Sequence, residues 1–373
     1  MESNELEITT NSDELNNKNK KPISKKTIAS IIFLLAITIV VFIVFFSFND
    51  INETIELIKT VDPVKILIAV VCLILYAAIW PVSLCMISRR NKIKTSLLDD
   101  YFIGGSEFFF NNITPFSSGG QPVQIYLYTQ KKVSASQSTG IILANFIVLM
   151  FASNIFALAS LIYYGRFSQN FSSGTSWMIV LGFIMNLFTL VFMILIATSS
   201  GIRKFFRGIL ELLCKNKFIA KYLAKSIPAF DTYCENAQAA TKEIFSHKIT
   251  FIFAIIVRMI SLLFYYAIPY YILGALGVDV TFEVMPYIIL ASAFAITTMV
   301  WVPTPGGTGG IEFAFTTIFT TFAGVTTAIG AAGMVLWRAL TYYLLTILSL
   351  VCYIVFEFFV KKLTKKAKDV EKS

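Results

Sequence analysis

Long apolar runs alternate along the chain with shorter polar stretches. Since about 20 apolar residues cross a bilayer, these runs predict about six full membrane spans. The predicted spans are residues 27–48, 63–87, 137–164, 176–198, 249–273 and 330–360. The pattern therefore predicts an all-α polytopic membrane protein.

Two polar interruptions rich in proline and glycine fall inside apolar segments. Break one is residues 111–122, within segment one (97–130), and break two is residues 303–310, within segment two (284–324). Broken helices persist at membrane depth only where they are buried in protein or line a wet cavity. In transporters, paired broken helices commonly mark the substrate site. We therefore expect the breaks to lie at the functional site.

The distribution of lysine and arginine predicts how the segments are oriented, because these residues collect on the cytoplasmic side. Basic stretches precede the first span, follow the second span and segment one, and occupy 199–248 and 361–373, whereas 49–62 holds four acids and one lysine. Both termini are therefore expected in the cytoplasm. Segment one then enters from the cytoplasmic face and segment two from the outer face, as in an inverted repeat. The alternative is that each break is the tip of a hairpin between full spans, eight in all.

The same pattern divides the chain into regions. Residues 1–26 predict a disordered cytoplasmic tail, 27–360 an integral membrane domain and 361–373 a basic cytoplasmic tail. The loop 199–248 has nine basic residues against four acids, with apolar residues at helical spacing. It predicts a helix on the anionic inner leaflet, with a solvated basic loop as the alternative. Pro228 is positioned to start a second helix there.

Composition excludes several classes of protein. The chain has 373 residues, of which 56% are hydrophobic and 14% charged, against about 25% charged in soluble domains. The net charge of +9 comes from residues flanking spans, so no nucleic-acid partner is expected. The five cysteines form no CxxC pair and His247 is the single histidine, so we expect no metal site, no cofactor and no catalytic triad.

Ionisable residues inside spans are costly and usually functional. Glu107, Arg258, Glu312, Arg338 and Glu357 have such positions. Glu312 follows two glycines at the predicted start of a half-helix, where free amides favour anions. Arg258 and Arg338 each need a carboxylate or a bound anion, and the alternative is a buried Arg–Glu pair that only locks the bundle. Glu357 is expected to be interfacial.

Break one offers neutral polar side chains in place of charges. They either line a path for a headgroup or satisfy the unwound backbone. These residues are Asn111, Asn112, Thr114, Ser117, Ser118, Gln121 and Gln124.

These motifs together resemble the lysylphosphatidylglycerol synthase transmembrane-domain (flippase-like) family, over roughly residues 27–360. The first motif is Asn112-x-x-Pro115-x-x-x-Gly119-Gly120-Gln121-Pro122, and the more specific second motif is Pro303-x-Pro305-Gly306-Gly307-x-Gly309-x-x-Glu312, accompanied by Arg258 and Arg338. Many relatives carry an acid and an arginine after the first glycine pair. Gln121 and Gln124 stand there instead, which argues against a charged role for break one.

The resemblance implies a translocator of a phospholipid or lipid-linked substrate in a bacterial cytoplasmic membrane. One candidate is aminoacylated phosphatidylglycerol, whose positive charge repels cationic antimicrobial peptides. Arg258, Arg338 and the amides of Gly309–Glu312 would then hold phosphate, and Gly306, Gly307, Gly309 and Gly310 would all belong to the substrate site. Glu312 would meet a cationic amine, and Asn112, Gln121 and Gln124 would line the path.

In bifunctional relatives a soluble domain transfers lysine from lysyl-tRNA to phosphatidylglycerol. This chain ends at Ser373, soon after its last span, so we expect no transferase domain and no enzyme activity by itself. Two alternatives stay open: a membrane component of a phosphatidylglycerol lysyltransferase, or a scaffold that docks a lipid-modifying enzyme through 199–248.

Overall fold

The computed structural model of this chain describes residues 51–91, 93, 95–114, 117–162, 173–215, 227–299, 304, 307, 309–322 and 324–371. The predicted first span (27–48) and the predicted N-terminal tail (1–26) lie outside these residues. The chain forms two units, Met1–Phe45 and Phe46–Ser373. Everything below belongs to the second unit.

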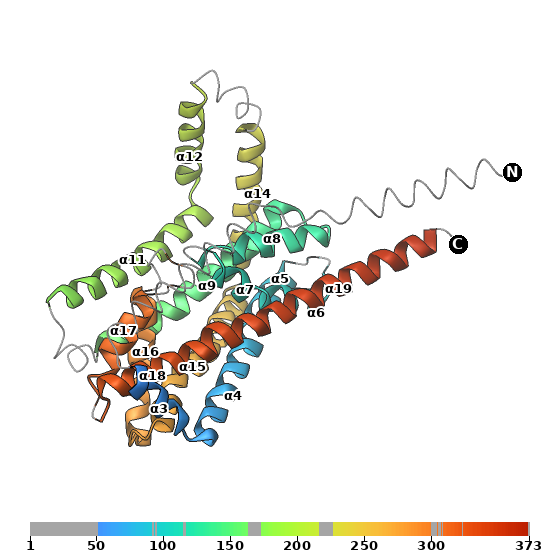
Figure 1. The fold of residues 1–373 in the computed structure, drawn as a ribbon. Coiled ribbons are helices and arrows are strands. Elements are labelled where there is room, and N and C mark those ends of the chain that lie inside the picture. Colours follow the sequence, from blue (N-terminus) through green and yellow to red (C-terminus); the bar gives the residue numbers. More distant parts are fainter. Residues whose placement is uncertain are drawn as a thin grey trace. The chain divides into compact units, whose positions relative to one another are not determined.

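The described residues form helices, with no strand among them (Figure 1). Their order is α3 (Ile51–Lys59), α4 (Pro63–Ile79), α5 (Val82–Arg90), α6 (Leu97–Gly105), α7 (Glu107–Asn112), α8 (Gly120–Gln130), α9 (Ala135–Ile162), α11 (Ser173–Thr198), α12 (Ser200–Leu213), α14 (Ile227–Ser246), α15 (Lys248–Ala275), the 3₁₀-helix η3 (Phe282–Val284), α16 (Met285–Met299), α17 (Gly310–Phe319), α18 (Thr327–Arg338), the π-helix η5 (Ala339–Leu344) and α19 (Leu345–Glu371).

Five described helical stretches are long and apolar enough to cross a membrane. They are Pro63–Arg90, Ala135–Leu161, Val180–Thr198, Lys248–Ala275 and Thr327–Phe359. They coincide with the second to sixth predicted spans, so the prediction of an all-α polytopic membrane protein is confirmed. The last span begins earlier than predicted, because the Thr326 hydroxyl accepts a hydrogen bond from the Ile329 amide and caps α18. Its helix continues to Glu371, into the predicted C-terminal tail.

The first of these spans is not one continuous helix. α4 ends at Ile79 and α5 begins at Val82, because Pro81 has no amide hydrogen and its ring clashes with the preceding turn. Trp80 caps the end of α4 and is 5% exposed. The kink therefore places one large indole side chain in the interior of the bundle.

Segment one is a hairpin of short helices. α6, α7 and α8 have 9, 6 and 11 residues, each fewer than the roughly 20 needed to span. The Lys131 ammonium lies 2.6 Å from the Asp99 carboxylate, so both ends of the segment meet. They follow α5, whose Arg90 lies 3.0 Å from His247 at the start of α15. Segment one thus opens at the end of the bundle where α5 ends and α15 begins.

Segment two is a hairpin that opens at the other end. α16 and α17 have 15 and 10 residues and pack on each other. The Asp62 amide donates to the Ala275 carbonyl at 3.0 Å, so α4 begins where α15 ends. Segment two starts just beyond that point, and a Cβ atom on Gly324, which follows α17, would lie 3.7 Å from Val278. The two segments therefore enter from opposite ends, which agrees with the predicted inverted arrangement.

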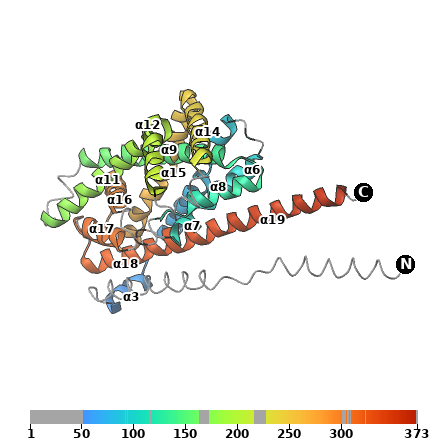
Figure 2. The same ribbon diagram turned by 90° about the horizontal axis from the view of Figure 1, so that it is seen from above.

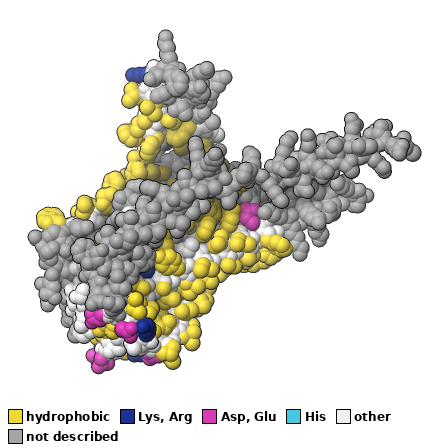
Figure 3. Space-filling view, in the orientation of Figure 1, with side chains coloured by type: hydrophobic (Ala, Val, Ile, Leu, Met, Phe, Trp, Pro, Cys, Tyr) yellow, Lys and Arg dark blue, Asp and Glu magenta, His cyan; other side chains and the backbone are white. Residues whose placement is uncertain are grey.

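The outer surface of the long helices is apolar. On α4, Val64 and Leu67 are 63% and 61% exposed, while Leu73 and Tyr76 on the other face are buried. Figure 3 shows hydrophobic side chains over much of the visible described surface, with charged side chains at the end where α3 lies. Such broad apolar exposure is typical of a surface covered by lipid.

The described part of the predicted loop 199–248 includes α12 and α14, which lie side by side in Figures 1 and 2. Arg203 of α12 lies 2.7 Å from Glu235 of α14. α14 begins at Ile227, as Pro228 predicted, and packs against α9 through its buried Ala237 and Ile244. α12 has no buried residue. Its binding to anionic lipids stays a prediction.

Candidate functional site

A buried ion pair lies beside break two. The Glu312 Oε1 and Arg338 Nε atoms are 2.6 Å apart, and both residues are 6% exposed. The other oxygen, Oε2, accepts a hydrogen bond of 2.7 Å from the Gly309 amide. Gly309 has a φ of 95°, a left-handed conformation that favours glycine. The sequence left open whether Arg338 meets a carboxylate or an anion, and in this structure it meets a carboxylate.

The other residues predicted around break two are only partly described. Gly310 is the first residue of α17, and the Gly307 amide donates to the Thr304 carbonyl at 3.2 Å. Gly306 lies outside the described residues. Substrate binding by these glycines therefore stays a prediction.

Arg258 is far from Glu312 and Arg338 in the sequence and lies near break one. Its guanidinium carbon lies 3.7 Å from the centre of the Trp80 ring, which is a cation–π arrangement. Nη2 donates to Ser83 Oγ and, at 3.0 Å, to Asn145 Oδ1. Arg258 is 1% exposed, and its Nε and Nη1 atoms have no hydrogen-bond partner among the described residues. α15 thus places a buried cation behind Trp80.

Glu107 is the acidic residue of this region. It is 3% exposed and accepts hydrogen bonds from Trp80 Nε1 at 3.0 Å and from the amides of Gln121 and Gln124 at 3.4 Å. No lysine or arginine among the described residues forms an ion pair with it. Break one therefore faces a carboxylate held by neutral donors.

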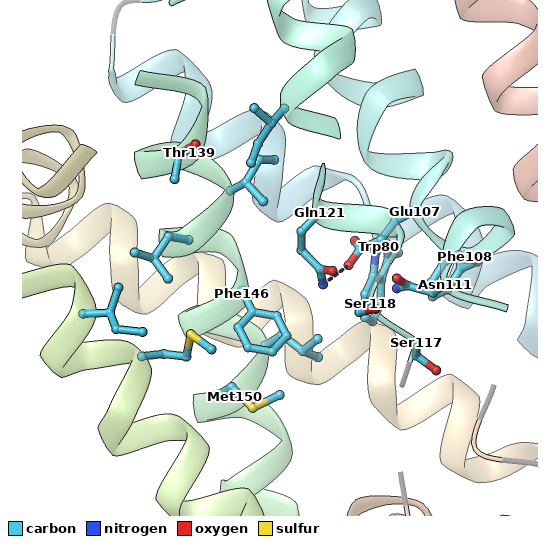
Figure 4. A pocket seen from close by; sticks show the side chains of 16 residues that line it. Trp80, Glu107, Phe108, Asn111, Ser117, Ser118, Gln121, Thr139, Phe146 and Met150 are labelled. Carbon is cyan, nitrogen blue, oxygen red and sulfur yellow. Dashed lines mark hydrogen bonds between the residues drawn. The ribbon is translucent and has the colours of Figure 1, made fainter. Parts of the chain in front are cut away.

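A cavity of about 500 Å³ lies beside Glu107. Its polar wall comes from segment one and Trp80, and its apolar wall from α9 and α11. Figure 4 shows Gln121, Asn111 and Ser118 near Glu107 and Trp80, with Phe146 and Met150 on the apolar side. The volume lies in the range of small-molecule sites. The cavity therefore suits a ligand that is polar at one end and apolar at the other.

Gly120 makes the close packing of break one feasible. The Gly120 amide donates to Asn111 Oδ1 at 2.8 Å. A Cβ atom on Gly120 would lie 2.7 Å from that oxygen, 2.7 Å from Glu107 Cγ and 2.9 Å from the Glu107 carbonyl oxygen. Glycine is therefore required here by the approach of Glu107 and Asn111.

We expect Gly120→Ala to lower the unfolding free energy by about 1–3 kcal/mol, because α7 must move to admit the methyl group. The measurement is equilibrium unfolding of the purified protein in mixed micelles. Gly208→Ala on α12 is the matched control, since a Cβ atom there would meet nothing within 4 Å. Alanine should be neutral or slightly stabilising at that helical position. Equal effects of the two substitutions would contradict the packing described.

α19 packs against segment one (Figure 2), and Tyr342 of η5 also contacts it. The Ser349 hydroxyl accepts from the Phe109 amide at 2.9 Å and donates to the Gly105 carbonyl at 2.7 Å. Asn112 donates to Thr346 at 2.8 Å, and its carbonyl accepts from the Tyr342 hydroxyl at 2.9 Å. Asn112 is therefore held by the last span, and it is not among the residues that line the cavity.

The predicted site residues thus separate into two groups. Arg258, Gln121 and Gln124 gather around Glu107 and Trp80, whereas Glu312 and Arg338 pair at break two. Sequence reasoning missed the roles of Trp80, Ser83 and Asn145. The available signal was the Trp80-Pro81 pair in the middle of a span, which marks a kink at membrane depth.

The family described as "Lysylphosphatidylglycerol synthase TM region" matches residues 31–349, a range that includes both breaks and both clusters. The "UPF0104 membrane protein" of Archaeoglobus fulgidus is 25% identical to this chain over 273 residues, which cover 71% of this chain and 78% of that protein. No solved structure matches the chain.

Proposed function

The chain belongs to the lysylphosphatidylglycerol synthase transmembrane-region family, and from this premise we propose that it translocates a phospholipid or a lipid-linked substrate across the membrane. The observation that supports the proposal most is the cavity of about 500 Å³ beside break one. A lipid headgroup would bind against the polar wall of this cavity while the acyl chains lie against the apolar wall.

The apolar wall is built for a hydrocarbon chain. Leu143, Phe146 and Met150 follow one another on one face of α9, at spacings that a helix brings together. Met193 and Ile196 of α11 also line the cavity. Methionine and other flexible apolar side chains adapt to ligands of irregular shape. This wall favours an amphiphile over a fully polar substrate.

The arrangement of the two segments also supports translocation. They open at opposite ends of the bundle, and such inverted pairs let a transporter expose one site to each side in turn. We place the chain in a bacterial cytoplasmic membrane with both termini in the cytoplasm, and we take anionic lipids as the partners of the basic loop 199–248. Aminoacylated phosphatidylglycerol is a candidate substrate, whose export would raise envelope charge and resistance to cationic peptides.

The test is leaflet exchange of labelled phosphatidylglycerol and lysyl-phosphatidylglycerol in liposomes that contain the purified chain. We expect Leu143→Trp to lower the exchange rate about tenfold or more, because the indole fills the cavity and must be displaced. Leu158→Trp is the matched control on the same helix, since Leu158 is 53% exposed on the outer surface. It should leave exchange unchanged.

Exchange that is equally fast in both variants would remove the cavity from the path. The absence of exchange by the unaltered chain, for both lipids, would contradict translocation of these substrates.

One observation favours a second function, a membrane scaffold or membrane component for a lipid-modifying enzyme such as a phosphatidylglycerol lysyltransferase. Phe205 and Leu212 of α12 are 63% and 61% exposed, beside arginines that bridge to α14. An apolar face next to fixed charges suits a protein partner. This function predicts no lipid exchange by the chain alone.

A further inference from the structure

We propose that Glu107 forms a binding subsite for a primary ammonium group carried by an amphiphilic ligand in the cavity of break one. The inference rests on the proposed function, since it names the headgroup chemistry that the same cavity selects. It moves the amine-binding role from Glu312, where the sequence placed it, to Glu107.

The argument begins with the charge balance of the two buried glutamates. Glu312 already meets a guanidinium at 2.6 Å and a backbone amide at 2.7 Å, so a ligand amine would have to compete with both. Glu107 is equally buried but has only neutral donors, two of them at 3.4 Å. Charge-assisted hydrogen bonds are shorter and stronger than these contacts. Of the two buried glutamates, Glu107 is therefore the one without a cation in direct contact among the described residues.

Arg258 is not a direct ion-pair partner of Glu107. Its guanidinium stacks on the face of the Trp80 ring, while Glu107 accepts a hydrogen bond from the Nε1 atom of the same ring. The nearby positive charge reduces the cost of burying the carboxylate. It forms no ion pair with Glu107 among the described contacts. Arg258 thus helps to stabilise the buried Glu107 carboxylate without forming an ion pair with it.

The Gln124 amide beside Glu107 also lacks a hydrogen-bond donor within the described part of the chain. Its Oε1 atom is buried with no partner among the described residues. The orientation of that amide is defined, because its nitrogen donates to both the Ile103 carbonyl and Glu107. A primary ammonium brings three donors and no acceptor. It therefore supplies the positive charge that Glu107 lacks, whereas Gln124 is not among the residues that line the cavity.

The cavity indicates that the ammonium belongs to an amphiphile. Glu107 and Gln121 line the same cavity as Phe146 and Met193, so a ligand bound at the carboxylate continues into an apolar space. A small soluble amine would leave that space empty. A lipid whose headgroup carries a primary amine would fill both parts.

The test compares two lipids that differ only in the amine. Purified full-length chain in detergent is loaded with fluorescent phosphatidylglycerol, which is then displaced with phosphatidylethanolamine or with N-acetyl-phosphatidylethanolamine. We expect the free amine to compete about tenfold better, the effect of one charge-assisted hydrogen bond. Glu107→Gln should reduce this ratio to near one. Glu357→Gln, which removes a carboxylate outside the cavity, should leave it unchanged.

A ratio near one in the unaltered chain, or a ratio that survives Glu107→Gln, would overturn the proposal. Displacement by soluble ethanolamine as effective as by the lipid would overturn its amphiphile part. Should Glu107→Gln fail to fold, labelling answers the same question in the unaltered chain. Dicyclohexylcarbodiimide should modify Glu107, and phosphatidylethanolamine, but not its N-acetyl form, should protect it, as read by peptide mass spectrometry.

The binding assay and the exchange assay test the two proposals separately. Amine-selective binding without leaflet exchange would keep the subsite and remove the transport function. Exchange without any amine preference would keep transport and remove the subsite.

Discussion

Glu312→Ala is expected to lower the free energy of unfolding by about 3–5 kcal/mol, because it leaves the Arg338 guanidinium buried without its carboxylate. Both side chains are 8% exposed, so solvent cannot replace the lost partner. The Gly309 amide loses its acceptor in the same step. Equilibrium unfolding in mixed micelles with increasing dodecyl sulfate measures the effect.

Two further variants separate the ion pair from other causes. Glu357→Ala is the control, since among the described contacts that carboxylate accepts one hydrogen bond of 3.3 Å, from Gln130, and a small change is expected. The double variant Glu312→Gln/Arg338→Met removes both charges and should recover part of the loss. If Glu312→Ala were no more harmful than Glu357→Ala, the ion pair would not stabilise the bundle.

Arg258→Ala is expected to cost about 3 kcal/mol or more, for three reasons that add. It removes the guanidinium–indole contact, which is worth about 2 kcal/mol when desolvated. It leaves Ser83 and Asn145 without a charged donor. It also leaves the buried Glu107 carboxylate without a nearby positive charge. Unfolding in mixed micelles again gives the magnitude.

The coupling of Arg258 to Glu107 can be measured directly. If the two charges compensate each other across Trp80, then Glu107→Gln should be less harmful in an Arg258→Met background than alone. Arg90→Ala is the surface control, because Arg90 is exposed and contacts only His247 among the described interactions. Strict additivity of the two core substitutions would show that the charges are independent.

The fold was predictable because it follows from local features. A membrane span is recognisable in a sequence as a run of about 20 apolar residues. The short helices α6, α8, α16 and α17 are limited in length by prolines and glycines that are present in the sequence. The opposite entry of the two segments followed from lysine and arginine counts alone. Such signals need no knowledge of which helices touch.

The site was only partly predictable, because it depends on contacts between distant residues. Trp80, Glu107 and Arg258 come from the C-cap of α4, from α7 and from α15, and no periodicity indicates that they meet. Glu312 and Arg338 were identified as functional candidates, yet the sequence could not distinguish a mutual pair from two ligand-binding charges. Pro81 could be read from the sequence, but the sequence did not show that a kink there directs Trp80 into the interior.

The packing of the last span against segment one has a consequence for biosynthesis. Phe109 and Ser349 are 240 residues apart, and a ribosome adds roughly 5–20 residues per second, so roughly 10–50 seconds pass between their synthesis. During that interval the Phe109 amide and the Asn112 carboxamide lack their final partners. The first half of the membrane domain thus enters the bilayer with its polar interior incomplete, and a nascent chain released before residue 349 could not complete it.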